Sequence, residues 1–234
     1  MKKIKQSLNY FFPHISFEEN NIKALIDIKY SSLKQKHIPI TQLFTKQHRF
    51  FTISIWCVSL CNMIGFYFLS NWLPTLAKVS GYDLQQAVLL GATLQIGGAL
   101  GTFIMGRMID KQDFFYVMVP CFVIAIISIV GISQLSSQQG ILFLLTFIAG
   151  FAVVGGQPAI NAMAANFYPV NLRTTGVGWS LGIGRIGSVI GPLLGGYLLL
   201  INLSISSIFF IIALLSTLIV ALLVWLYISI NKKI

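Results

Sequence analysis

The feature that most constrains this chain is a long stretch without charge. From Phe114 to Leu172 the sequence contains no Asp, Glu, Lys or Arg. A helix that crosses the roughly 30 Å hydrocarbon core of a bilayer needs about 20 mostly apolar residues at about 1.5 Å per residue. The stretch is long enough for two such helices, and the polar turn between them is residues 133–140, SQLSSQQG. Only 9% of all residues are charged, against about 25% in a typical soluble domain, so we expect the apolar surface to face lipid.

Apolar lengths of this kind recur along the chain and predict six transmembrane helices. Continuous apolar runs favour helices, because membrane-spanning strands are short and alternate apolar with polar residues. We therefore expect an all-α membrane protein that folds as a six-transmembrane-helix bundle. The expected spans are Phe50–Leu76, Leu84–Gly106, Phe114–Ser133, Ile141–Tyr168, Thr174–Leu200 and Ser204–Ile230.

Lysine and arginine are unevenly distributed, and this predicts the orientation of the bundle. Nine of the 16 precede Phe50, and Lys78 alone falls in a loop on the opposite side. Cytoplasmic loops carry the excess of Lys and Arg, so we expect a multi-pass protein of the cell (inner) membrane with both termini in the cytoplasm. The predicted organisation is a basic cytoplasmic segment at 1–49, the bundle at 50–230 and a tail at 231–234. The first segment is either a short helix on the inner leaflet or a mobile linker.

The net charge of +10 also raises the possibility of nucleic-acid binding, but no basic motif with interleaved aromatic residues accompanies it. Three cysteines lie inside apolar segments, and an odd number gives no disulfide framework. No His or Cys occurs at the spacing of metal ligands. We expect no nucleic acid, no metal and no cofactor.

Two glycine-rich motifs resemble enzyme signatures but lack the required context. Residues 182–187 match Gly-x-Gly-x-x-Gly, and residues 178–182 match Gly-x-Ser-x-Gly. A dinucleotide site needs a strand before the motif and an acid about 20 residues later, and a nucleophilic serine needs a base. No acid or histidine follows Asp113, so we expect no enzyme. Glycines four apart instead predict close helix packing, at Gly97/Gly101, Gly178/Gly182, Gly187/Gly191 and Gly191/Gly195.

Arg185 lies within the fifth expected span. A cation near the bilayer centre costs at least about 2.5–3.5 kcal/mol unless it faces a bundle interior or water. No span contains an acid, so its partner must be carbonyl groups, an acid from another polypeptide or a bound anion. A guanidinium pairs with a carboxylate through two parallel hydrogen bonds, which favours substrate contact; a structural ion pair or a gate is the alternative.

Counting inward from the span ends places Asn62, Gln95, Gln157 and Arg185 near mid-depth on four different helices. Asn161 lies one helical turn from Gln157 on the same face. Secondary transporters bind substrate near the membrane midplane, so these residues are candidates for a binding site. Hydrogen bonding between helices, worth about 0.6 kcal/mol each, is the alternative role for any one amide.

Several motifs resemble a known family of membrane proteins. Residues 106–111, GRMIDK, resemble the Gly-x-x-x-Asp-Arg/Lys loop that the major facilitator superfamily carries between its second and third helices and repeats between its eighth and ninth. Residues 67–76, 168–179, 182–187 and 191–196 are similar to the seventh, tenth and eleventh helices of the aromatic acid/proton symporters. The resemblance spans about residues 40–200.

The resemblance implies the C-terminal half of the twelve-helix major facilitator fold, and transmembrane transport of small aromatic carboxylates with protons. It implies that Arg185 suits the carboxylate and that Trp179 or Tyr67 packs against the aromatic ring. The implied gating loop consists of Gly106, Arg107, Asp110, Lys111 and Arg173. Alternating access requires two bundles, so the expected partners include a complementary N-terminal six-helix half or a second copy, besides lipid, substrate and protons.

Two alternatives to transport by a two-part carrier remain open from the sequence. The chain could be a truncated or non-transporting membrane remnant that binds a ligand or partner. It could also be a homodimeric six-helix carrier of another substrate, in which the glycine faces supply the contacts.

Overall fold

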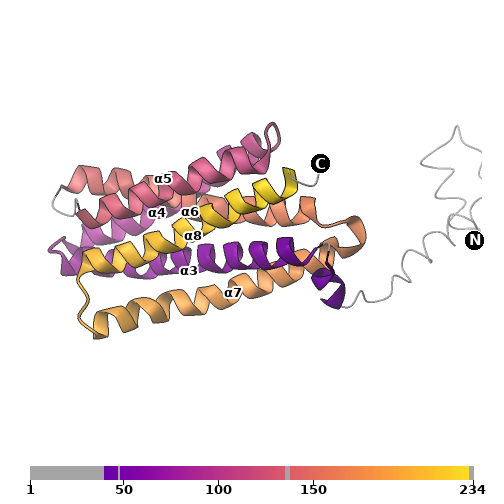
Figure 1. Ribbon diagram of the computed structural model, residues 1–234. Coiled ribbons are helices and arrows are strands. Elements are labelled where there is room, and N and C mark those ends of the chain that lie inside the picture. The colour runs from indigo at the N-terminus through magenta and orange to yellow at the C-terminus, as the bar shows by residue number, and fades with distance from the viewer. Residues whose placement is uncertain (1–39, 47, 135–137, 232–234) are drawn as a thin grey trace, which may run out of the picture. The chain divides into compact units, whose positions relative to one another are not determined.

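The computed structural model describes residues 40–46, 48–134 and 138–231 (Figure 1). Within these ranges six helices are long and apolar enough to cross a membrane, which confirms the six predicted spans. A short 3₁₀ helix, η1 (Ile40–Phe44), precedes them. The first 39 residues of the expected basic segment lie outside the described residues. The six helices are α3 (Arg49–Val79), α4 (Leu84–Ile109), α5 (Phe114–Gln134), α6 (Gln139–Phe167), α7 (Val170–Leu200) and α8 (Ile205–Asn231).

Three helix boundaries differ from the sequence expectation by three residues or more, and one of them is the end of α4, at Ile109 rather than Gly106. Helix α3 continues past Pro74 to Val79, whereas the expected span ended at Leu76. Helix α7 begins at Val170 with Pro169 as its N-cap, four residues before the expected start. A proline costs little at a helix start, because the first backbone N–H groups have no partner within the helix. Arg173 therefore lies in the first turn of α7 rather than in a loop.

The bundle is built from closely packed helix pairs. Helix α4 has its most extensive contacts with α6, α3 with α7, and α5 with α8; α3 and α7 run side by side in Figure 1. Glycines allow the first two contacts. A Cβ added at Gly187 or Gly191 of α7 would lie 2.6–2.7 Å from a backbone carbonyl oxygen of α3. In α4, Gly97 and Gly101 face backbone carbonyls of α6 in the same way.

The predicted packing role of Gly178 and Gly182 is wrong. Both are exposed, and an added Cβ would meet nothing within 4 Å. At about 100° per residue, the glycines that face α3 occupy one side of α7 and these two occupy the opposite side. The spacing of four residues was correct for a helix face, but it did not say which face is covered.

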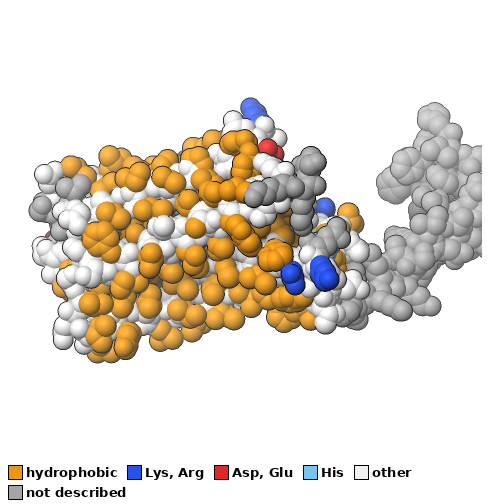
Figure 2. All heavy atoms as spheres, viewed as in Figure 1, with side chains coloured by type: hydrophobic (Ala, Val, Ile, Leu, Met, Phe, Trp, Pro, Cys, Tyr) orange, Lys and Arg blue, Asp and Glu red, His pale blue; other side chains and the backbone are white. Residues whose placement is uncertain are grey.

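The surface of the bundle separates apolar and charged side chains. Large hydrophobic residues cover its length, whereas Lys and Arg gather near the end where α3 begins (Figure 2). We call this the basic end; its described cations include Arg49, Arg107, Lys111 and Arg173. Lys78 lies near the other end of α3. A wide apolar belt with charge at the ends is typical of a protein in a bilayer, and this chain is a multi-pass membrane protein.

Candidate functional site

Three amide side chains form a hydrogen-bonded relay between α3 and α6. The Asn62 amide nitrogen donates to Oε1 of Gln157 at 2.8 Å and to the backbone oxygen of Val153 at 3.1 Å. Nε2 of Gln157 then donates to Oδ1 of Asn161 at 3.3 Å. Asn62 and Gln157 are 1% and 7% exposed, whereas Asn161 is half-buried. The relay therefore leads from the interior of the bundle toward its surface.

Gln95, which the sequence placed with these amides, is not part of the relay. Its nitrogen lies 3.4 Å from Oγ of Ser70, and the side chain is exposed. Ser70 is eight residues beyond Asn62 on α3, which corresponds to about 12 Å along the helix axis. Of the four predicted mid-depth positions, the structure joins Asn62 and Gln157 directly and adds Asn161, but it leaves Gln95 apart.

Arg185 lies at the depth of Asn62 and on the outer side of α7. Its neighbours Gly184 and Gly187 contact Ser59, Leu60 and Met63 of α3, and these residues flank Asn62 in the sequence. The Arg185 side chain itself is exposed. Among the described residues its guanidinium makes no hydrogen bond or ion pair. Arg185 and Asn62 therefore lie at the same level of the bundle, and no partner for the charge is found within the described part of this chain.

The two aromatic candidates lie apart from the amide relay. Trp179 is 45% exposed and stacks on Trp56, with ring centroids 6.0 Å apart and planes at 27°. Phe44 of η1 contacts Trp56 edge-on, with ring centroids 5.4 Å apart. Tyr67 is half-buried and contacts Phe66 at 5.0 Å. These rings offer flat apolar surfaces, but among the described residues neither candidate forms a hydrogen bond with Asn62, Gln157 or Asn161.

The predicted gating residues divide into two groups at the basic end. Gly106, Arg107, Asp110 and Lys111 lie where α4 ends, and Arg173 belongs to α7. The Arg107 guanidinium lies over the Phe103 ring, 4.5 Å from its centroid. Asp110 is exposed, and among the described residues it forms no ion pair. Both charged groups are therefore accessible to a partner.

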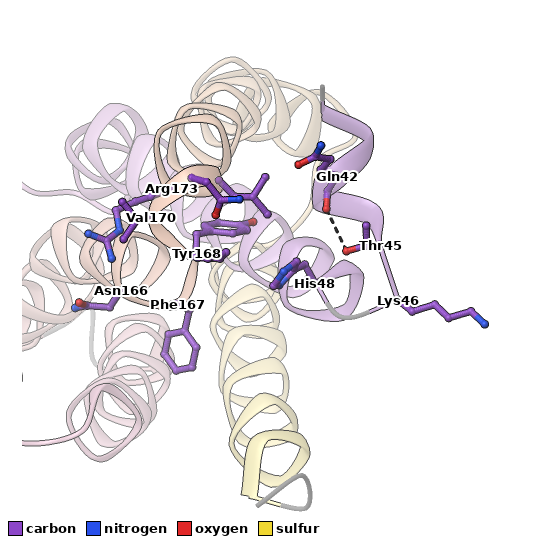
Figure 3. Close-up of a pocket in the computed structure, with 12 residues that line it drawn as sticks. Gln42, Thr45, Lys46, His48, Asn166, Phe167, Tyr168, Val170 and Arg173 are labelled. Carbon is purple, nitrogen blue, oxygen red and sulfur yellow. Dashed lines mark hydrogen bonds between the residues drawn. The ribbon is translucent and has the colours of Figure 1, made fainter. Parts of the chain in front are cut away.

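A polar pocket of about 910 Å³ opens at the basic end, between η1, the start of α3 and the α6–α7 junction (Figure 3). Arg173, His48 and Lys46 contribute to its rim, and in Figure 3 the Lys46 side chain extends away from it. The amide relay is not among its lining residues. Size alone therefore does not identify the substrate site, because this pocket is an open surface hollow.

A buried hydrogen-bond chain begins at Tyr168 in the lining of this pocket, and no motif in the sequence predicts it. The Tyr168 hydroxyl donates to Oγ1 of Thr52 at 3.1 Å, and Thr52 donates to the Leu43 backbone oxygen at 3.0 Å. We call these three residues the latch. Burial raises the pKa of Tyr168, and the hydrogen bond to Thr52 partly offsets this rise. The latch ties η1 and α3 to the α6–α7 junction.

Comparison with known proteins identifies the family. The family model described as Major Facilitator Superfamily matches residues 11–139 and 55–233, and the second range includes nearly all of the six spans. This chain belongs to the major facilitator superfamily. Its six helices thus correspond to one six-helix half of that fold.

Several similar proteins are named as transporters of aromatic acids. The chain is 34% identical over 175 residues to a gallate transporter of Pseudomonas putida, covering 75% of this chain and 39% of the relative. It is 36% identical over 174 residues to a benzoate transport protein of Acinetobacter baylyi, covering 74% and 37%. It is 34% identical over 166 residues to a 3-(3-hydroxy-phenyl)propionate transporter of Escherichia coli, covering 71% and 41%. The chain spans about two fifths of the length of these relatives.

Proposed function

We propose that this chain is one half of a twelve-helix secondary transporter that moves small aromatic carboxylates together with protons across the cell (inner) membrane. The basic end would face the cytoplasm, as would both termini, because Lys and Arg mark cytoplasmic loops. The names of the relatives point to transport rather than to catalysis. The substrate would bind between this bundle and a second one, near the depth of Arg185.

The observation that carries the proposal is the exposed guanidinium of Arg185, which lies at the level of the buried Asn62 amide and pairs with no described residue. Left against lipid, a cation near mid-bilayer costs at least about 2.5–3.5 kcal/mol. A polar cleft shared with a second bundle removes this cost, and a carboxylate in the cleft can accept two parallel hydrogen bonds from the guanidinium. Trp179 and Tyr67 would supply ring surfaces for the aromatic part of the substrate.

A second bundle is required because alternating access depends on two bundles that rock around a shared site. We propose a complementary N-terminal six-helix half as that partner. It would also meet Asp110 and Arg107, which are accessible at the basic end. Proton coupling would depend on groups of the partner as well, since no Asp or Glu follows Asp113 and none lies in α3 or α4.

The test is uptake of radiolabelled benzoate by cells that express this chain with and without the first six helices of the Acinetobacter baylyi benzoate transport protein. We expect uptake that needs both halves and that a protonophore abolishes. Equal uptake by this chain alone would contradict the two-half arrangement, and crosslinking would then show whether a second copy replaces the partner. Absence of uptake in both cases, with both halves present in the membrane, would contradict the proposed function.

A further inference from the structure

The direction of the amide relay is fixed by a backbone group. Asparagine and glutamine amides can often be turned by 180° without a visible change, because oxygen and nitrogen look alike. Here the Asn62 amide lies 3.1 Å from the carbonyl oxygen of Val153, and only its nitrogen can donate to that acceptor. Turning the Asn62 amide by 180° would place its oxygen against the carbonyl oxygen of Val153. The Asn62 nitrogen is therefore fixed as the donor to Gln157.

This orientation propagates along the relay. Because the Gln157 oxygen accepts from Asn62, its nitrogen faces Asn161 and must donate. The Asn161 oxygen is thereby occupied as an acceptor, and its two N–H donors remain at the half-buried end. Among the described residues no group accepts from them. Hydrogen bonds in a chain polarise one another, so the last donor is strengthened by the two before it.

We propose that the relay makes Asn161 a dedicated hydrogen-bond donor and thereby selects substrates that present an acceptor oxygen at this point. This inference rests on the proposed function and extends it. The Asn161 amide N–H, next to the α3–α6 contact, is the specificity determinant. Asn62 and Gln157 are positioning residues, which act through Asn161. A carboxylate or phenolate oxygen satisfies the donor, whereas an N–H group at the same place meets another donor.

A purely structural role for Asn161 predicts the opposite order of two substitutions. Asn161→Asp keeps an oxygen for the Gln157 donor, whereas Asn161→Ala removes it. If Asn161 only holds Gln157 in place, the Asp variant should resemble the wild type more closely. If Asn161 donates to an anion, the Asp variant is worse, because its carboxylate lacks the two N–H donors and repels the anionic substrate.

The experiment measures benzoate binding to the full chain, co-expressed with the N-terminal half used above and purified in lipid nanodiscs. We expect Asn161→Ala to weaken binding about tenfold and Asn161→Asp about a hundredfold. The matched control is Asn166→Asp, which makes the same change on an exposed residue of the same helix, outside the relay, and should change binding less than about twofold. Thermal unfolding of each variant checks that it folds.

A second measurement does not depend on the variants folding. In the nitrogen–proton NMR spectrum of wild-type protein, the Asn161 side-chain amide should shift on addition of benzoate, while that of Asn166 should not. Binding weakened less by Asp than by Ala, or an Asn161 signal unmoved at saturating benzoate, overturns this inference and leaves the proposed function intact. No benzoate binding by the wild type overturns both.

Discussion

The contact between α7 and α3 gives the sharpest prediction, through the substitution Gly191→Ala. A Cβ at this position would lie 2.7 Å from the Ile64 carbonyl oxygen and 3.0 Å from the Phe68 backbone nitrogen. Both are backbone atoms, so neither can move without shifting the helix. The matched control is Gly182→Ala on the same helix, where an added Cβ meets nothing within 4 Å.

Both variants gain the same backbone term, about 0.5–1 kcal/mol for Ala over Gly within a helix, so their difference isolates the contact. Overpacking of a tight contact costs about 1–3 kcal/mol. We therefore expect the free energy of unfolding of Gly191→Ala to be about 1–3 kcal/mol lower than that of Gly182→Ala. The assay is unfolding by titration of sodium dodecyl sulfate into mixed micelles, followed by far-UV circular dichroism. Equal stability of the two variants would refute the packing argument.

Two further predictions concern the latch and the mid-depth cation. Tyr168→Phe removes the buried hydrogen bond to Thr52 and should lower the free energy of unfolding by about 1 kcal/mol. The control Tyr227→Phe, at an exposed hydroxyl pair, should change this free energy little. Equal losses in the two variants would contradict the stabilising role of the latch. Arg185→Gln should weaken benzoate binding about a hundredfold and Arg185→Lys about tenfold, because lysine keeps the charge without the fork, with unchanged thermal unfolding. Destabilisation of both as large as the loss of binding would indicate a structural arginine. Arg49→Gln, at an exposed cation outside the proposed site, is the control for loss of a charge.

Hydropathy was sufficient to predict the six helices, because each span must be long and apolar to cross lipid. It failed at the start of α7, where Pro169 and Arg173 looked like a loop, although Pro169 fits a helix N-terminus and Arg173 lies in the first turn. The spacing of glycines predicted close packing correctly for Gly187 and wrongly for Gly182. Periodicity shows which residues share a helix face, but only tertiary contacts decide which face is covered.

The candidate site was predictable in part for the same reason. Counting from span ends gave the depth of Asn62 and Gln157, and the structure joins them. The same count placed Gln95 with them, but it cannot measure how helices are offset or rotated, and Gln95 lies against Ser70. The pairing of Tyr168 with Thr52 had no sequence signal, since the two are 116 residues apart and neither stands out.

The arrangement of the glycine contacts has a mechanical consequence. The backbones are in contact within the α3–α7 pair and within the α4–α6 pair, so we expect each helix pair to move as one rigid unit. Asn62 belongs to the first pair and Gln157 to the second, and their 2.8 Å hydrogen bond crosses the contact between the two pairs. Sliding one helix pair past the other by two residues, about 3 Å, would lengthen this distance to about 4.1 Å, beyond hydrogen-bond range. Such a shift would break the link from Asn62 through Gln157 to Asn161. A small displacement of the helix pairs would thus change the hydrogen-bonding preference of the Asn161 amide.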